Sequence, residues 1–139
     1  RFREFYQCDI DVINVEHLPM HFDAEMPAIM WEIINGLPGM KDENIQIRIS
    51  NRKIMMGLIE HLGIEDAASV TRFVDKLDKI GVEEVTRILT SELGLTSEQA
   101  KQILNLASAK SLEDIKAEND QMKEGIEELS FVTCSSSGM

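Results

Sequence analysis

The chain opens with an alternation of mainly apolar and mainly polar residues and later changes to a helical spacing. Over residues 1–13, one set of alternate positions is mainly apolar and the other mainly polar, with Glu4, Phe5 and Ile13 as exceptions. The apolar set is Phe2, Tyr6, Cys8, Ile10 and Val12, and the polar set is Arg1, Arg3, Gln7, Asp9 and Asp11. Because successive side chains of a strand point to opposite faces, the pattern predicts a strand with one packed face. Its polar face holds a small polar ligand or is simply solvated, as many antiparallel faces are.

Two helices and a second strand are predicted next. Asp23 is expected to cap a helix that ends near Gly36. The apolar stripe of this helix consists of Met26, Met30, Ile33, Ile34 and Leu37. Isoleucines alternate with polar residues over 44–50 and predict a half-buried strand, after which Asn51 is expected to cap a helix over 52–62.

From Ile64 onward the pattern is helical throughout. Helices are predicted over 66–80, 82–93, 97–108 and 111–128, with no strand between them. Thr96 begins the third of these with a capping-box pattern, and Ser111 with Asp114 resembles another capping box at the start of the fourth. Residues 130–139 are rich in Ser and Gly and are expected to fray. The fold class is therefore mixed α/β (α+β) over residues 1–64, followed by a small all-helical domain over residues 65–139.

Composition narrows the functional classes. The net charge is −11 over 139 residues, which makes the chain a poor general binder of polyanions. No apolar run reaches about 18 residues, so we expect a soluble, cytoplasmic protein without membrane contact. Cys8 and Cys134 fit no metal-ligand spacing. His17 and His21 are four apart, but Pro19 between them breaks any shared helix face, so no metal site is predicted.

Several segments resemble one known family. Arg1-Phe-Arg-Glu-Phe-Tyr-Gln-Cys-Asp-Ile-Asp11 resembles the second half of motif 2 of class II aminoacyl-tRNA synthetases, in the form found in histidyl-tRNA synthetases. The resemblance continues through Asp23-Ala-Glu25, the segment 45–53 with its Asn-Arg-Lys, and Asp75-Lys-Leu-Asp-Lys-Ile-Gly81. It covers about residues 1–105. It implies part of an antiparallel-sheet catalytic core followed by a helical insertion domain.

The resemblance also implies roles for single residues. Gln7 and Asp11 match the residues that bind histidine, at its amino-acid end and at its imidazole. Arg1 matches a weaker contact to the ATP phosphates. A carboxylate accepts a hydrogen bond from an imidazole N–H, and a guanidinium binds phosphate oxygens, so the residue types suit these roles. Asn51, Arg52 and Lys53 are treated as a mark of the family and not as site residues.

The implied activity is that of a histidine–tRNA ligase, which joins L-histidine to tRNA(His) through a histidyl-adenylate. ATP would be a substrate with Mg²⁺, and the parent protein would be a homodimer. The chain has no counterpart of the first strand of motif 2, of motif 1, of motif 3 or of an anticodon-binding domain. We therefore expect this segment to be inactive alone, with no catalytic residue of its own.

The helical block carries a further expectation and two alternatives. If one of its faces binds tRNA, Lys76, Lys79 and Arg87 are the candidate cations. The first alternative is the synthetase-like, histidine-sensing regulatory subunit of ATP phosphoribosyltransferase, which is not catalytic and generally lacks an insertion domain. The second is an acidic module that binds an unnamed partner. The helical block over 65–139 favours the ligase over the regulatory subunit.

Overall fold

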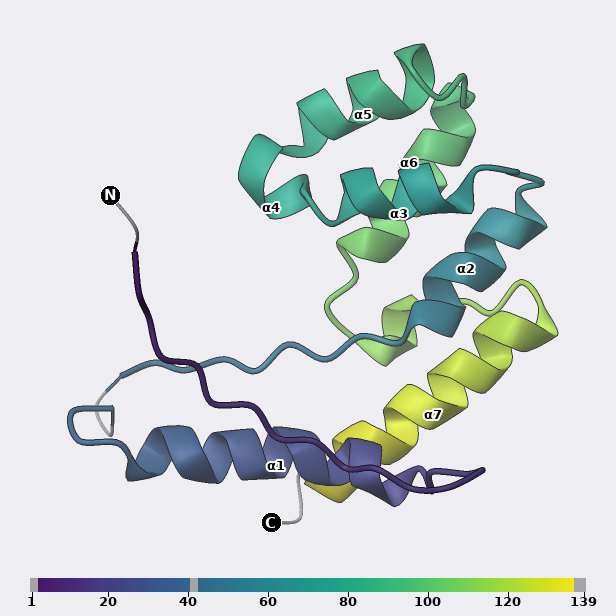
Figure 1. Cartoon of the computed structure of the whole chain (residues 1–139). Helices are drawn as coiled ribbons and strands as arrows, with labels where there is room; N and C mark the ends of the chain where they lie inside the picture. The colour runs from purple at the N-terminus through teal and green to yellow at the C-terminus, as the bar shows by residue number, and fades with distance from the viewer. Residues whose placement is uncertain (1–2, 41–42, 137–139) are drawn as a thin grey trace. The chain divides into compact units, whose positions relative to one another are not determined.

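The computed structural model describes residues 3–40 and 43–136 (Figure 1), with side chains described up to residue 134. Two compact units are present, and each is described by itself. One consists of residues 1–47 and 132–139, and the other of residues 48–131. Every regular element within the described ranges is a helix. The predicted domain boundary after residue 64 stays a prediction, whereas the compact units divide after Ile47.

The first unit contains helix α1, His21–Gly36. The predicted cap at Asp23 is wrong, because the helix begins two residues earlier and Met20 occupies the cap position without a side-chain hydrogen bond. Backbone bonds from Phe22 to Pro19 and from Asp23 to Met20 form its first turn instead. His21, expected in the connecting segment, is the first helical residue.

Neither predicted strand forms among the described residues. Residues 3–14 and 44–50 have no regular secondary structure, although Figure 1 shows the chain before α1 as a long extended trace. A strand satisfies its backbone only by pairing with a neighbouring strand, and no strand is assigned among the described residues. The apolar and polar residues therefore alternate in the sequence, but the hydrogen bonds of a β-sheet do not form in these two segments. The sheet part of the predicted fold class is not shown.

The second unit is built from helices packed around a common core. Its helices are α2 (Arg52–His61), α3 (Ala67–Val74), α4 (Leu77–Ile80), α5 (Val82–Ser91), α6 (Ser97–Ala107), the short 3-10 helix η1 (Leu112–Asp114) and most of α7 (Asp120–Ser136). The most extensive helix–helix contacts are those of α2 with α3 and α6, and of α5 with α3, α4 and α6. The buried core consists of Ile54, Leu58, Ile59, Val70, Val85, Leu89, Leu95, Ala100, Ile103, Leu104, Met122 and Leu129.

Helix pairs α2–α3 and α5–α6 are joined by the same kind of turn. Each turn reads Leu-Gly followed by Ile or Leu, and the glycines, Gly63 and Gly94, have φ angles of 68° and 70°. Only glycine adopts this left-handed backbone at little cost, which explains its place just after each helix. Asp66 and Thr96 then cap the following helices. The unit therefore contains one helix–turn–helix pattern twice, with α4 between the copies.

One capping residue also joins the two turns. The predicted capping box at Thr96 is confirmed, with its hydroxyl accepting from the Gln99 backbone at 3.2 Å and Gln99 Oε1 accepting from the Thr96 N–H at 2.9 Å. Gln99 Nε2 donates to the Leu62 carbonyl at 3.0 Å, at the end of α2. Gln99 therefore takes part in the cap of α6 and also connects the second helix pair to the first.

The remaining helix predictions need two corrections. The predicted helix over 66–80 divides into α3 and α4 at a turn through Asp75 and Lys76. The predicted helix over 111–128 is wrong at both ends. Ser111 caps only η1, and α7 begins at Asp120 and extends to Ser136, through part of the tail that was expected to fray. The helix over 52–62 and its Asn51 cap are confirmed.

Candidate functional site

The residues predicted to bind histidine lie on the extended segment before α1. Gln7 and Asp11 are both exposed. Gln7 Nε2 donates to Asp9 Oδ1 at 3.3 Å, a contact within the segment. Arg1 lies outside the described residues. The described residues therefore do not gather a pocket around Gln7 and Asp11, and their roles stay predictions.

The predicted cations Lys76 and Lys79 lie where α3 is followed by α4 (Figure 1), Lys76 at the cap position of α4 and Lys79 within it. Phe73 is the aromatic residue of this junction, and the side chains of Arg72 and Lys76 both lie over its ring. The Arg72 Cζ is 5.1 Å and the Lys76 Nζ 5.4 Å from the ring centroid. Both distances are within the range of a cation–π contact, so the ring holds two positive charges at one place.

The third predicted cation, Arg87, has different surroundings. It lies on α5, where its guanidinium donates to both carboxylate oxygens of Glu84 at 3.0 and 2.6 Å. Its Nη2 is also 3.6 Å from a carboxylate oxygen of Glu92. The hydrogen bonds to Glu84 raise the pKa of Arg87, and the same contact lowers the pKa of Glu84. Arg87 thus belongs to a cluster in which carboxylates outnumber the cation.

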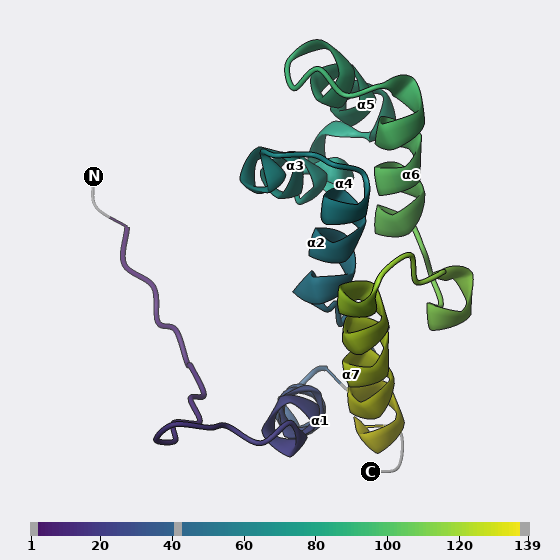
Figure 2. The ribbon, with the colours of Figure 1, turned by 90° about the vertical axis from the view of Figure 1, so that its right-hand side faces the viewer.

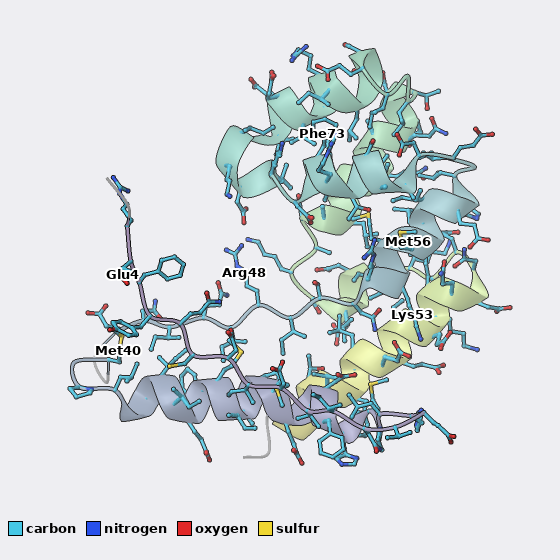
Figure 3. The ribbon with its side chains drawn as sticks, in the orientation of Figure 1. Glu4, Met40, Arg48, Lys53, Met56 and Phe73 are labelled. Atoms are coloured by element: carbon cyan, nitrogen blue, oxygen red, sulfur yellow. The ribbon has the colours of Figure 1, made fainter. Side chains whose placement is uncertain are left out.

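The strongest polar cluster joins the start of α2 to α7, and both helices contribute to it within the second unit (Figure 3). Lys53 Nζ donates to Glu124 at 2.6 Å and to Glu128 at 2.5 Å. Asn51 caps α2 through its Oδ1, which accepts from the Lys53 backbone at 2.8 Å, and its Nδ2 donates to Glu128 at 2.7 Å. We call these four residues the α2–α7 clamp.

The hydrogen bonds of the clamp shift the pKa values of Lys53 and Glu128. The hydrogen bond to Glu124, followed by the one to Glu128, raises the pKa of Lys53. The bonds from Lys53 and Asn51 lower the pKa of Glu128. The Glu128 side chain is only 20% exposed, which limits the screening of its charge by water.

Next to the clamp, α2 and α7 lie side by side (Figure 2) and approach so closely that neither Gly57 nor Gly125 leaves room for a Cβ. A Cβ added to Gly57 would lie 2.6 Å from Met122 Cγ and 2.9 Å from its backbone nitrogen. A Cβ added to Gly125 would lie 2.9 Å from Ile54 Cγ1. Asn119 bridges the same contact, since its Oδ1 accepts from the Met122 N–H at 2.9 Å and its Nδ2 donates to the Gly57 carbonyl at 2.8 Å.

Sequence reasoning left Lys53 outside any site and did not find this cluster. A usable signal was present, because Glu124 and Glu128 are four residues apart and share one face of a helix. The lysine that they bind is more than seventy residues earlier in the chain, however. No local pattern connects the two.

The second unit also has a shallow cleft of about 760 Å³. Its wall is formed by the ends of α2 and α6 and by the segment 108–118, with Met122 at its base. Its polar groups are mixed in sign, and Lys116 is 3.8 Å from Glu118. The cleft therefore favours no single charge type of ligand.

Membrane-spanning helices and clusters of metal-ligating side chains are both absent from the part of the chain that the structure describes. No helix there is both long and apolar enough to cross a membrane. No group of three or more His, Cys, Asp and Glu side chains there is arranged to hold a metal ion. Cys8 and Cys134 are exposed and not joined by a disulfide.

Comparison with known proteins shows which proteins the segment is similar to. No family model matches the chain. A histidine–tRNA ligase of Thermobifida fusca (strain YX) is 51% identical over 109 residues, which cover 77% of this chain and 24% of that protein. The histidine–tRNA ligase of Clostridium tetani (strain Massachusetts / E88) is 41% identical over 140 residues, covering 95% of this chain and 31% of that protein. The chain is related to a segment of the histidyl-tRNA synthetases.

The solved structures agree with the sequence relatives. The crystal structure of histidyl-tRNA synthetase from Nostoc sp. PCC 7120 superposes with a TM-score of 0.79 at 29% sequence identity. The match covers 88% of this chain and 31% of that one. The chain thus spans less than a third of the length of these relatives. The resemblance to histidyl-tRNA synthetases that was inferred from the sequence is confirmed.

Proposed function

We propose that the protein carrying this chain is a histidine–tRNA ligase. The observation that supports the proposal best is the 51% identity over 109 residues with a protein of that name. The matched region contains 77% of the chain, so the similarity is not confined to one motif. The ligase would activate L-histidine with ATP, accompanied by Mg²⁺, and transfer it to tRNA(His).

Gln7, Asp11 and Arg1 are the proposed substrate contacts. Asp11 would accept a hydrogen bond from the imidazole of histidine, which discriminates against side chains that lack this donor. Gln7 would bind the amino-acid end, and Arg1 would contact the ATP phosphates. At about 3.3 Å per residue, an extended backbone between Gln7 and Asp11 would separate them by roughly 13 Å. They would therefore bind opposite ends of the ligand.

The catalytic groups would come from other parts of the protein. Adenylate formation requires positive charge at the α-phosphate and accurate positioning of the attacking carboxylate. Among the described residues no such arrangement surrounds Gln7 and Asp11, which are exposed on an extended segment. This supports a role for the segment in binding substrates within a larger site. The assembly would be a homodimer and would act in the cytoplasm.

The helical unit is the proposed contact for tRNA, through Lys76, Lys79 and Arg87. Lys76 and Lys79 are exposed at the α3–α4 junction, which supports this role for them. Arg87 is held by Glu84 and Glu92, so its positive charge is largely neutralised. The proposal is accordingly weaker at Arg87.

Histidine-dependent ATP–pyrophosphate exchange on the full-length protein tests the function. We expect exchange in the wild type and a large loss, of about a hundredfold or more, in Asp11→Ala, because a site built around a hydrogen bond is left with an unpaired polar group. Glu43→Ala removes another exposed carboxylate and serves as the matched control. Histidine binding without exchange would indicate the regulatory subunit instead. Exchange that is unaffected by Asp11→Ala would remove Asp11 from the site.

A further inference from the structure

The helical unit is connected to the other compact unit at two places in the chain. The chain passes between the units after Ile47 and again after Phe131. The first connection is an extended segment, and the second lies within the helix α7. The α2–α7 clamp is within a few residues of both, with two of its members following the first connection and two preceding the second. The clamp therefore sets how far apart the two connections lie.

The clamp differs from the other ion pairs of the described residues. Lys53 Nζ donates to both Glu124 and Glu128, and Asn51 Nδ2 also donates to Glu128, so three hydrogen bonds converge on one place. The Glu128 side chain is less exposed than any other charged side chain in those ion pairs. An isolated exposed pair contributes little, because water screens it and its side chains lose freedom. Converging, partly buried bonds to charged groups are stronger and fix one geometry.

The apolar contacts between α2 and α7 have a different role from the clamp. Met122 and Leu129 of α7 lie in the same buried core as Ile54 of α2, so the unit should stay folded when the charges of the clamp are removed. Apolar burial is non-directional. Polar groups with one set of partners specify the register of the elements that they join. We therefore expect the clamp to fix the ends of the two helices more than it stabilises the unit.

We propose that the four residues of the α2–α7 clamp are positioning residues for the transfer of histidine to tRNA. They hold the two connections at a fixed separation and so restrict the orientations that the helical unit can adopt, without touching a substrate. The inference rests on the proposed ligase function, which places the histidine contacts outside this unit and the tRNA contacts on it. Formation of the adenylate uses the first set of contacts alone. Transfer requires both substrates to be aligned, and small misplacements of reacting groups slow a reaction strongly.

The test separates the two steps of the reaction in the full-length protein. Lys53→Met removes the cation that joins the two carboxylates and keeps the length of the side chain. We expect single-turnover transfer from preformed histidyl-adenylate to tRNA to slow about tenfold, because the reacting groups are less well aligned. Histidine-dependent ATP–pyrophosphate exchange, which needs no tRNA, should stay within about twofold of wild type. Glu124→Gln/Glu128→Gln keeps the shape of both side chains without their charge and should reproduce this difference between the two steps.

Matched variants make the same chemical changes outside the clamp. Lys123→Met removes an exposed lysine of α7, and Glu127→Gln neutralises an exposed glutamate of the same helix. Both should leave the transfer rate within about twofold of wild type, as is usual for surface positions without partners of this kind. Lys53→Arg keeps a cation with several donors and should restore most of the transfer rate. A side chain needed only for packing would show no such dependence on charge.

Two results would overturn the proposal, with circular dichroism showing that each variant is folded. Transfer at the wild-type rate in Lys53→Met would remove the clamp from this step. Equal losses of transfer and of ATP–pyrophosphate exchange would show that the clamp supports the fold as a whole and not the position of the helical unit.

Amide hydrogen exchange distinguishes failure of this inference from failure of the proposed function. In Lys53→Met, the amides of residues 124–131 should exchange about tenfold faster, because that end of α7 opens locally more often, whereas the amides of α5 should keep their protection. Unchanged protection of residues 124–131 would overturn the role of the clamp. Local opening in a protein whose wild type lacks ATP–pyrophosphate exchange would overturn the ligase function, and the transfer step with it, and leave the clamp's hold on the two connections standing.

Discussion

Residues 3–40 and residues 48–131 are both rich in apolar side chains, but they bury them to very different extents. In the first region Phe5 is 81% and Tyr6 103% exposed, and among the described residues of that region only Ala24 is buried. In the second region Leu89 and Ile103 are fully buried in a continuous core. The difference lies in the kind of element that each sequence encodes and not in its hydrophobicity.

A helix closes its own hydrogen bonds, whereas a strand depends on a neighbour. The second region encodes helices whose apolar faces meet one another, so it packs without outside help. In the first region apolar and polar residues alternate, a pattern that is buried on one side only when the segment joins a sheet. The described residues contain no sheet. The comparison teaches that an alternating pattern of apolar and polar residues forms a strand only where a neighbouring strand is present.

The largest expected effect comes from the same substitution in the two regions. Ile103→Ala removes a side chain with 0% exposure and should destabilise the helical unit by about 2 to 5 kcal/mol, because it loses buried area and leaves a cavity. Ile13→Ala removes a side chain that is 89% exposed and should change the free energy of unfolding by no more than about 0.5 kcal/mol. Urea denaturation followed by circular dichroism measures both. Similar values for the two variants would contradict the comparison.

A pair of glycine substitutions should give opposite signs. Gly57→Ala places a Cβ 2.9 Å from the Met122 backbone nitrogen, so α2 and α7 must separate, at a cost of about 1 to 3 kcal/mol. This exceeds the gain of at most about 1 kcal/mol in helix propensity. At Gly36 nothing lies within 4 Å of an added Cβ, so Gly36→Ala should be neutral or slightly stabilising. Thermal unfolding of both variants checks the signs, and a stabilising Gly57→Ala would show that the two helices are free to move apart.

The smallest effect concerns the α2–α7 clamp and depends on pH. Because the pKa of Glu128 is lowered in the folded protein, its contribution to stability is present above the ordinary carboxylate pKa of about 4.3 and is lost as pH falls through the lowered value. Glu128→Gln should therefore lower the melting temperature at neutral pH, with the difference from wild type shrinking in acid. Glu127→Gln, at an exposed neighbouring position, is the control. A difference independent of pH would exclude the charge as its cause.

Features of the helical unit that depend on near neighbours in the sequence were predictable. The cap at Asn51 and the capping box at Thr96 involve residues two or three positions apart, so the local pattern contains all the information. The start of α7 was not predictable in this way. Asn119 caps it while also binding the Gly57 carbonyl, a partner 62 residues away.

The predicted substrate contacts rest on resemblance alone and stay predictions. Gln7 and Asp11 are named by their match to a family motif, and their alternation alone left both a ligand face and a solvated face open. Arg72 and Phe73 were missed because their meaning depends on Lys76 one turn later and on charges from elsewhere in the fold. Charge counting over the whole chain hides such a local excess.

The α2–α7 clamp determines where the length of the helical unit can change. It fastens the residues where the chain enters the helical unit to those where it leaves, since Asn51 and Lys53 bind Glu124 and Glu128. A segment whose two ends are held side by side can be lengthened, shortened or exchanged for a tight turn while the flanking backbone keeps its path. Changes in length should therefore be tolerated in the turns between the helices of this unit and should be destabilising within its core and at the clamp.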